Sequence, residues 1–173
     1  MSAAPDRQLP PDHNHYETPR ALFRLLDREF DFDVDAYASA TNRRCPLFID
    51  EARDALATPW TWDTFEVTTA SDFGPTVFAN PPHSNPEMGH AVERMAEQSE
   101  THGIVVVGLV RPSLSTRWWH GTVMRWASEV RIFTSRLAYE YNGNPIRGDR
   151  QDSILIVFRP GVYGPQWTTM RPR

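Results

Sequence analysis

The stretch TVFANPPHSN at residues 76–85 joins an apolar run to an asparagine, two prolines and a histidine. The run is typical of a buried strand, which we predict over residues 76–79. Two consecutive prolines remove two backbone donors and restrict the chain after Asn80. We therefore expect the carbonyl oxygens of Asn80 and Pro81, with the Asn80 side chain, to form a rigid set of hydrogen-bond acceptors at the end of this strand.

Such a set suits a planar amino group that donates two hydrogens. Accepting both hydrogens draws electron density toward the nitrogen and helps it attack an electrophilic methyl group, through positioning and electrostatics. A ring at position 83 would then lie against a flat heterocycle. The alternative is an ordinary turn, because Asn-Pro is a common turn dipeptide. The position directly after an apolar strand favours the site.

Apolar runs and helical patterns alternate along the rest of the chain. We predict helices over 17–30, 86–99 and 117–127, and strands over 32–38, 103–110, 129–135 and 153–159. In the first helix, Thr18 is expected as the N-cap and Pro19 as the first helical residue. This order predicts an α/β, Rossmann-like fold with a mostly parallel sheet and helices on both faces.

Ligands of such sheets bind at the carboxyl ends of the strands, where both Asp35 and Asn80 are expected. The boundaries that we predict are a flexible arm over 1–15, a single domain over 16–160 and a C-terminal tail over 161–173. No internal repeat is visible.

The amino-acid composition indicates a globular domain and excludes two kinds of lysine-dependent site. The chain has 173 residues, of which 40% are hydrophobic, as in a globular domain. All 18 basic residues are arginine, which excludes a Walker-type phosphate loop and a Schiff-base lysine. His13 and His15 lie in a polar, proline-rich segment that favours a frayed terminus over a metal site. With one cysteine, Cys45, and no long apolar stretch, we expect a soluble, cytoplasmic protein.

Charge is divided unevenly along the chain. The first 100 residues hold 8 Arg and 18 acidic residues, a net charge of −10, whereas the last 73 hold 10 Arg and 4 acidic residues, a net charge of +6. Such asymmetry indicates a region that faces a polyanion such as nucleic acid. The alternative is chance clustering on a solvated surface.

NPPH at residues 80–83 resembles the (D/N/S)-PP-(Y/F/W) motif of amino-methyltransferases that use S-adenosylmethionine. The ordered set YETPRALFRLLDREFDFDVDAYASATNRRCPLF, RDAL, ANPPHSN and TRWWH resembles, more specifically, the phage-type DNA N6-adenine methyltransferases, over about residues 16–158. The resemblance implies methyl transfer from S-adenosyl-L-methionine to the N6 amine of adenine in DNA, by an enzyme that a phage encodes and that works in the bacterial cytoplasm.

The same resemblance assigns roles to individual residues. Three groups are expected to bind the cofactor: Tyr16, Thr18 and Pro19 at its methionine end, Asp35, Ala36, Ala38 and Ser39 in the loop after the first strand, and Asp54 facing its adenosine. The catalytic group is expected to be Asn80, Pro81 and Pro82, which hold the amine, with His83 against the base. On the alternative interpretation, Tyr16 and Pro19 merely staple the helix and Asp54 is a surface charge.

His83 departs from the Tyr or Phe that the family has at this position. Imidazole is smaller than a phenyl ring and titrates, so we expect retained methyl transfer with weaker base holding, favoured above the pKa of the histidine. The expected DNA contacts are Ser84, Asn85, Arg111, Arg117, Arg147 and Arg150. The target base must be flipped out or already single-stranded. Trp118 and Trp119 are expected in the core rather than as stacking platforms.

Two alternatives remain open from the sequence. The same chemistry suits another amine, such as cytosine N4, an RNA base or a protein glutamine. A catalytically weak DNA-binding relative is a further possibility, because of His83. Parallel methyl-transfer assays on DNA, RNA and protein would separate the substrates, and binding of the cofactor without transfer would favour the last alternative.

Overall fold

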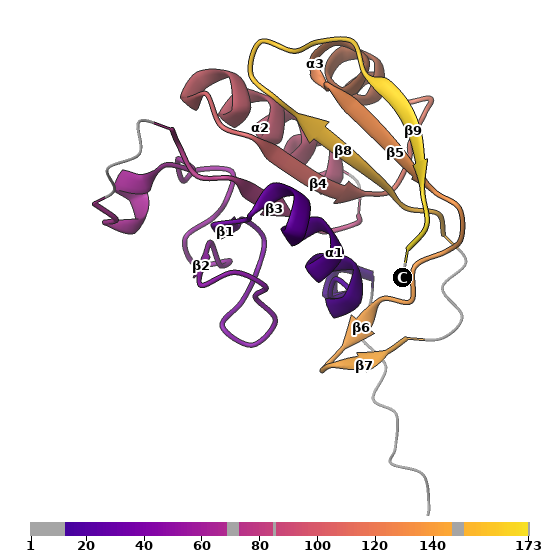
Figure 1. Cartoon of the computed structure of the whole chain (residues 1–173), viewed down its shortest axis with the longest axis horizontal. Helices are drawn as coiled ribbons and strands as arrows, with labels where there is room; N and C mark the ends of the chain where they lie inside the picture. The colour runs from indigo at the N-terminus through magenta and orange to yellow at the C-terminus, as the bar shows by residue number, and fades with distance from the viewer. Residues whose placement is uncertain (1–12, 69–72, 85, 147–150, 173) are drawn as a thin grey trace, which may run out of the picture.

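The computed structural model of the chain describes residues 13–68, 73–84, 86–146 and 151–172. Within these residues, seven strands form one sheet in the order β2-β1-β3-β4-β8-β5-β9, and β6 pairs with β7 (Figure 1). The strands are β1 (Val34–Asp35), β2 (Leu47–Phe48), β3 (Val77–Ala79), β4 (Val106–Val110), β5 (Glu129–Phe133), β6 (Glu140–Tyr141), β7 (Asn144–Pro145), β8 (Ile154–Phe158) and β9 (Gln166–Met170). The helices are α1 (Arg20–Phe30), α2 (Glu87–His102) and α3 (Met124–Trp126), with short helical turns η1 (His13–His15), η2 (Trp62–Phe65) and η3 (Trp119–Val123).

The sheet is mixed. Strand β8 runs antiparallel to both of its neighbours, β4 and β5, whereas β2, β1, β3 and β4 are parallel to one another and β9 is parallel to β5. An α/β architecture is therefore confirmed. Because β1, β3 and β4 are parallel, their carboxyl ends lie at one edge of the sheet, and the loops that follow them meet there.

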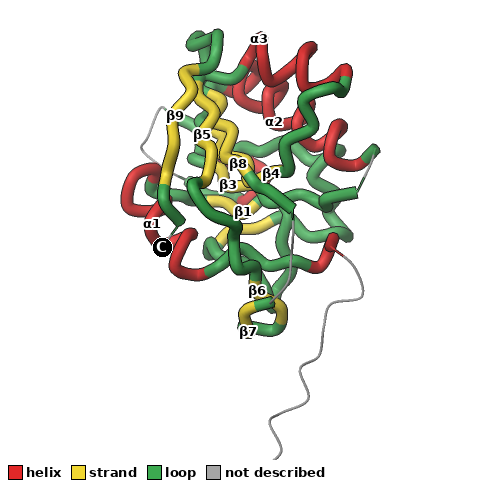
Figure 2. The backbone as a smooth tube through the Cα atoms, turned by 90° about the vertical axis from the view of Figure 1, so that its right-hand side faces the viewer, coloured by secondary structure: helices red, strands yellow, loops and turns green. Residues whose placement is uncertain are grey.

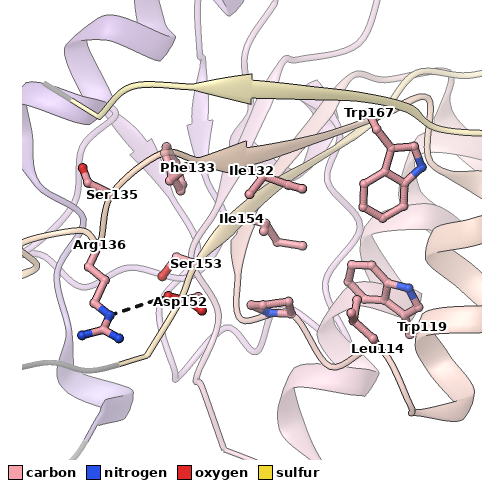
Figure 3. Close-up of a pocket in the computed structure, with 11 residues that line it drawn as sticks. Leu114, Trp119, Ile132, Phe133, Ser135, Arg136, Asp152, Ser153, Ile154 and Trp167 are labelled. Carbon is pink, nitrogen blue, oxygen red and sulfur yellow. Dashed lines mark ion pairs between the residues drawn. The ribbon is translucent and has the colours of Figure 1, made fainter.

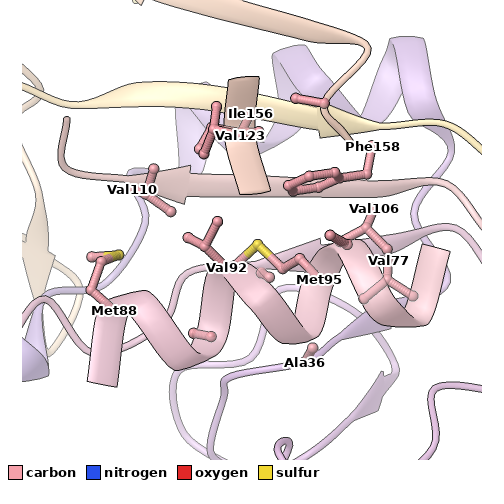
Figure 4. Packing of buried hydrophobic residues seen from close by; sticks show 14 of the residues in the cluster. Ala36, Val77, Met88, Val92, Met95, Val106, Val110, Val123, Ile156 and Phe158 are labelled. Carbon is pink, nitrogen blue, oxygen red and sulfur yellow. The ribbon is translucent and has the colours of Figure 1, made fainter. Parts of the chain in front are cut away.

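Two apolar clusters cover the two faces of the sheet. Along β4, Val107 and Leu109 belong to the cluster around α1, whereas Val106 and Val110 belong to the cluster around α2. Since neighbouring residues of a strand point to opposite faces, α1 and α2 lie on opposite sides of the sheet, as Figure 2 shows. Met95 of α2 is fully buried against the face of the sheet that α2 covers (Figure 4).

The residues at the start of α1 and at the end of α2 explain why these helices begin and end where they do. Helix α1 starts at Arg20 and Pro19 is its N-cap residue, so the expectation that Thr18 caps the helix and Pro19 is helical was wrong by one position. The Thr18 carbonyl instead accepts a hydrogen bond from the Arg44 side chain, which holds this residue outside the helix. Helix α2 ends at His102 and is capped by Gly103, whose φ of 65° is the left-handed conformation that glycine adopts easily.

Each predicted strand and helix overlaps an observed element, although the strand expected over 32–38 is only the two residues of β1, and several further elements were not predicted. Strands β2, β6 and β7 have two residues each, and β9 lies within the segment 161–173 that we expected to be a tail. The helix expected over 117–127 contains the π-helical turn η3 before α3. Trp118 and Trp119 are buried, which confirms that they belong to the core. In the described part of the chain, each helix is too short or too polar to cross a membrane.

Candidate active site

A cavity of about 560 Å³ lies beside the ends of β1 and β3. The residues that line it and that the sequence predicted as site residues are Ala36, Ala38, Ser39, Asp54, Asn80 and Pro82. They come from three separate segments, which follow β1, β2 and β3, and both β2 and β3 pair in parallel with β1. Asp50 and Glu51 also line this cavity, and the sequence analysis did not single them out. The volume is that of a small-molecule site.

A smaller polar cavity of about 40 Å³ adjoins it, because Asn14, Tyr37, Asn42 and Asn80 line both. The smaller cavity is also lined by Tyr16, Thr18 and Asp35, which were predicted to bind the cofactor. Pro19 and Pro81 line neither of these two cavities. Of the eight predicted cofactor-binding residues, seven therefore line one or the other of these two adjoining cavities.

Asp35 is a carboxyl group buried at the end of β1, with 4% of its surface exposed. Its Oδ2 accepts a hydrogen bond of 3.0 Å from the Arg44 backbone N–H, and its Oδ1 has no hydrogen-bond partner among the described residues. Burial raises the pKa of Asp35 to about 7, although the nearby backbone N–H groups of Arg44 and Tyr37 act in the opposite direction. A buried oxygen without a partner is unfavourable, so this atom is suited to a ligand that carries a donor or a positive charge.

Arg44 holds the wall of the smaller cavity together. Its Nε donates to the Thr18 carbonyl at 3.0 Å, and its Nη2 lies 3.2 Å from Glu140 Oε2 and 3.6 Å from Glu17 Oε2. The Arg44 side chain is only 4% exposed, so these ion pairs are shielded from solvent. Sequence reasoning missed this residue because its partners lie 26 and 96 positions away.

The Asn80 side chain has a defined orientation. Its Nδ2 donates to the backbone carbonyl of Tyr16 at 3.0 Å, and its Oδ1 lies 3.2 Å from His83 Nε2. The other ring nitrogen of His83, Nδ1, accepts a hydrogen bond of 3.1 Å from Arg111 Nε. Arg111, which was expected to contact DNA, follows β4 and is buried, with 9% of its surface exposed. The Tyr139 ring lies edge-on to His83, at 5.5 Å between centroids.

The remaining predicted site residues differ in exposure and in hydrogen bonding. Ser84 exchanges two hydrogen bonds with Asn14, since its hydroxyl accepts from Asn14 Nδ2 and its N–H donates to Asn14 Oδ1. Asp54 is exposed, has a φ of 57° and accepts a hydrogen bond from the Leu56 N–H. Arg117 is exposed at the start of the helical segment that leads into η3. Asn85, Arg147 and Arg150 lie outside the described residues.

A third cavity, of about 320 Å³, lies elsewhere on the molecule and contains none of the predicted site residues. Figure 3 shows the indoles of Trp119 and Trp167 at one end of it and the ion pair of Arg136 with Asp152 at the other. Within the described residues, His, Cys, Asp and Glu side chains form no cluster of three or more that is suited to a metal ion. The candidate active site is therefore the region around Asp35 and Asn80.

A model of a known protein family matches the chain. The model of the family described as DNA N-6-adenine-methyltransferase (Dam) matches residues 7–168, which is most of the chain. The matched residues include the ends of β1 and β3 and the loops that line the two adjoining cavities. No curated protein matches the chain.

Proposed function

The chain belongs to the DNA N-6-adenine-methyltransferase (Dam) family and is a DNA N6-adenine methyltransferase; on this premise we propose how its residues bind the reactants. The proposed methyl donor is S-adenosyl-L-methionine, and the proposed donor site is the pair of adjoining cavities at the ends of β1 and β3. The proposed fold type is the Rossmann-like fold of this enzyme class, with β8 as the antiparallel strand of the sheet.

The donor site has the chemistry that the cofactor requires. Ala36, Ala38 and Ser39 are small, so they leave room for a ligand beside the backbone after β1. The oxygens of Asp54 and its acidic neighbours, Asp50 and Glu51, are suited to accept hydrogen bonds from ribose hydroxyls. When it is bound, S-adenosylmethionine supplies a methyl group on a positively charged sulfur.

The smaller cavity is proposed to receive the amino acid end of the cofactor. Asp35 Oδ1 is buried, has no hydrogen-bond partner among the described residues and belongs to a residue that lines this polar cavity. An ammonium group offers the donor and the positive charge that this oxygen lacks. Tyr16 and Thr18 line the same cavity, in agreement with their proposed role. Pro19, at the N-cap of α1, is proposed to act by fixing the start of the helix.

The orientation of Asn80 is the observation that carries the proposal for the target base. Because Nδ2 donates to the Tyr16 carbonyl, Oδ1 is the amide atom that is able to accept a hydrogen from the adenine amine. The carbonyl of Pro81 is proposed as the second acceptor, with Pro82 closing the donor side. Holding both hydrogens would orient the N6 lone pair toward the methyl group. As the nitrogen–carbon bond forms, the carbon–sulfur bond of the donor would break to leave a neutral thioether, and the N6 ammonium would then lose one proton to water.

The adenine is proposed to be flipped out of a duplex or already unpaired when it reaches this strand end. Arg117 is exposed and is proposed to contact phosphates, as are Arg147 and Arg150. Ser84 and Asn85 are proposed to border the target base. Arg111 is proposed to act from beneath the motif, through its hydrogen bond to His83.

The test is Asn80→Ala, measured by transfer of a labelled methyl group to unmethylated DNA and by mass spectrometry of the digested nucleosides. Wild type is expected to yield N6-methyladenine, and the variant to lose activity by on the order of 100-fold, as when one acceptor or donor of a transition state is removed. Cofactor affinity and thermal unfolding of the variant control for misfolding. Transfer by Asn80→Ala at the wild-type rate would contradict the proposed role.

A further inference from the structure

A directional chain of hydrogen bonds runs through the motif. Arg111 Nε donates to His83 Nδ1 at 3.1 Å, His83 Nε2 lies 3.2 Å from Asn80 Oδ1, and Asn80 Nδ2 donates to the Tyr16 carbonyl at 3.0 Å. These hydrogen bonds link the end of β4 to the segment before α1, through the side chains of Asn80 and His83.

The groups at the two ends of this series of hydrogen bonds, the Arg111 guanidinium and the Tyr16 carbonyl, determine which atoms between them carry a proton. A guanidinium group only donates, so His83 Nδ1 must be an acceptor and carry no proton. A backbone carbonyl only accepts, so the Asn80 amide must turn its Nδ2 toward Tyr16 and its Oδ1 toward His83. His83 Nε2 must then donate to Oδ1. One arrangement satisfies all three contacts: neutral imidazole with its proton on Nε2.

We propose that His83 is a positioning residue that, as the neutral Nε2–H tautomer, fixes the Asn80 side chain for the adenine amine. This inference rests on the proposed function of Asn80. A carbonyl oxygen has two lone pairs, so Oδ1 is able to accept from His83 and from the substrate at the same time. His83 thereby does by hydrogen bonding what a stacked phenyl ring at this position is not able to do, since Phe carries no polar atom.

The surroundings of the ring support this role over stacking on the base. Tyr139 is 1% exposed and its ring meets that of His83 at an interplanar angle of 75°. The Tyr139 hydroxyl pairs with Ser153 Oγ at 2.8 Å, and its ring lies 5.2 Å from that of Tyr16. His83 is thus held along its edge by Arg111 and against its side by Tyr139, in the orientation that directs Nε2 at Asn80.

A second proton on the imidazole would break the chain. It would go to Nδ1, directly opposite the Nε–H of Arg111, and would set two donors and two positive charges against each other. The Arg111 guanidinium after β4 and the Tyr139 phenol before β6 are two titratable groups that contact the ring. Acid is therefore expected to release His83 from Arg111, so that the ring is no longer held in the orientation that directs Nε2 at Asn80.

The experiment compares kcat across pH for wild type, His83→Phe and His83→Gln, with saturating cofactor and DNA. Glutamine offers an N–H for Asn80 and a carbonyl oxygen for Arg111, but it does not titrate. His83→Phe keeps a ring and removes both hydrogen bonds, so kcat is expected to fall by on the order of 10- to 100-fold. His83→Gln is expected to remain within about threefold of wild type at alkaline pH and to lose the His83 part of the acid decline. His102→Gln, at the far end of α2, is the matched control.

Two results would overturn the inference: full activity in His83→Phe, or a loss in His83→Gln equal to that in His83→Phe. A second readout is independent of activity. The ¹⁵N NMR shifts of the His83 ring, assigned with His83→Gln, are expected to identify the neutral Nε2–H tautomer near pH 8, and a proton on Nδ1 there would refute the inference. Absence of methyl transfer by wild type would instead refute the proposed function, and the NMR result would still decide the tautomer.

Discussion

Replacing Asp35 by asparagine is expected to have two measurable effects, one on the pH dependence of this protein's stability and one on its binding of the methyl donor. Burial raises the pKa of Asp35 from 3.8 to about 7, so the folded state binds this proton more tightly than the unfolded state does. The resulting contribution to stability is fully present below pH 3.8 and is lost as the pH rises through about 7. At about 1.4 kcal/mol per pKa unit, the full effect is about 4 kcal/mol.

Between pH 5 and pH 7, the wild-type free energy of unfolding is therefore expected to lose about 2 kcal/mol from Asp35 alone. The asparagine side chain of the variant is not able to ionise, and its amide oxygen retains an acceptor for the Arg44 N–H. Relative to wild type, Asp35→Asn should thus gain about 2 kcal/mol over this interval, or about 4–8 °C in Tm for a chain of this size. The pKa of Asp33 is also raised by burial, but this effect is common to both proteins and cancels in the difference.

The assay is urea or thermal unfolding of the two proteins without cofactor at pH 5, 6 and 7. Asp152→Asn, at a side chain that is 77% exposed, is the surface control. A difference between Asp35→Asn and wild type that stays constant with pH would refute the buried, protonatable carboxyl group. In the same variant, calorimetric titration is expected to show at least about tenfold weaker binding of S-adenosylmethionine, because the partner of the ammonium group is gone.

The remaining predictions concern space in the site and in the core. Ala38→Leu projects a larger side chain into the 560 Å³ cavity and is expected to weaken cofactor binding by on the order of tenfold in calorimetry, whereas Ala38→Ser should bind as wild type does. Unchanged affinity in Ala38→Leu would mean that the cofactor binds elsewhere. Gly89→Ala sets a Cβ 2.7 Å from Trp118 Cδ1 and is expected to lower the free energy of unfolding by about 1–3 kcal/mol in urea. Gly121→Ala, where a Cβ meets nothing within 4 Å among the described residues, is the control, and equal stability of the two would contradict the close packing of α2 on Trp118.

The elements that the sequence predicted are those whose burial gives them a local pattern. Strands β4 and β8 are buried at every position, so each is a continuous apolar run. Strand β9 is exposed along most of its length at the edge of the sheet, and its polar sequence QWTTM has no apolar period to detect. Strands β2 and β7 have only two residues, which is too short for any periodic signal.

The residues of the candidate site also divide into those that a local sequence pattern predicts and those whose roles depend on distant partners. Asp35 and Asn80 were predicted because each directly follows or ends an apolar strand, and parallel pairing brings such positions to one edge. Asn14, Arg44 and Tyr139 were missed because their roles depend on partners far along the chain: Asn14 bonds with Ser84, 70 residues away, and Arg44 with Glu140, 96 residues away. A local pattern carries no information about such pairs.

Asp35 and His83 make opposite chemical demands that lead to the same dependence on pH. Asp35 must lose its proton to bind a cation, and its pKa of about 7 sets that step near neutrality. His83 must remain neutral, because its Nδ1 accepts from Arg111 while its Nε2 faces Asn80. The first proton weakens the donor site and the second releases the acceptor of the target amine, so acid acts on both substrates of the reaction. Measured at saturating cofactor, the part of the acid decline in kcat that His83→Gln removes therefore reports on His83, whereas the decline in cofactor affinity that Asp35→Asn removes reports on Asp35.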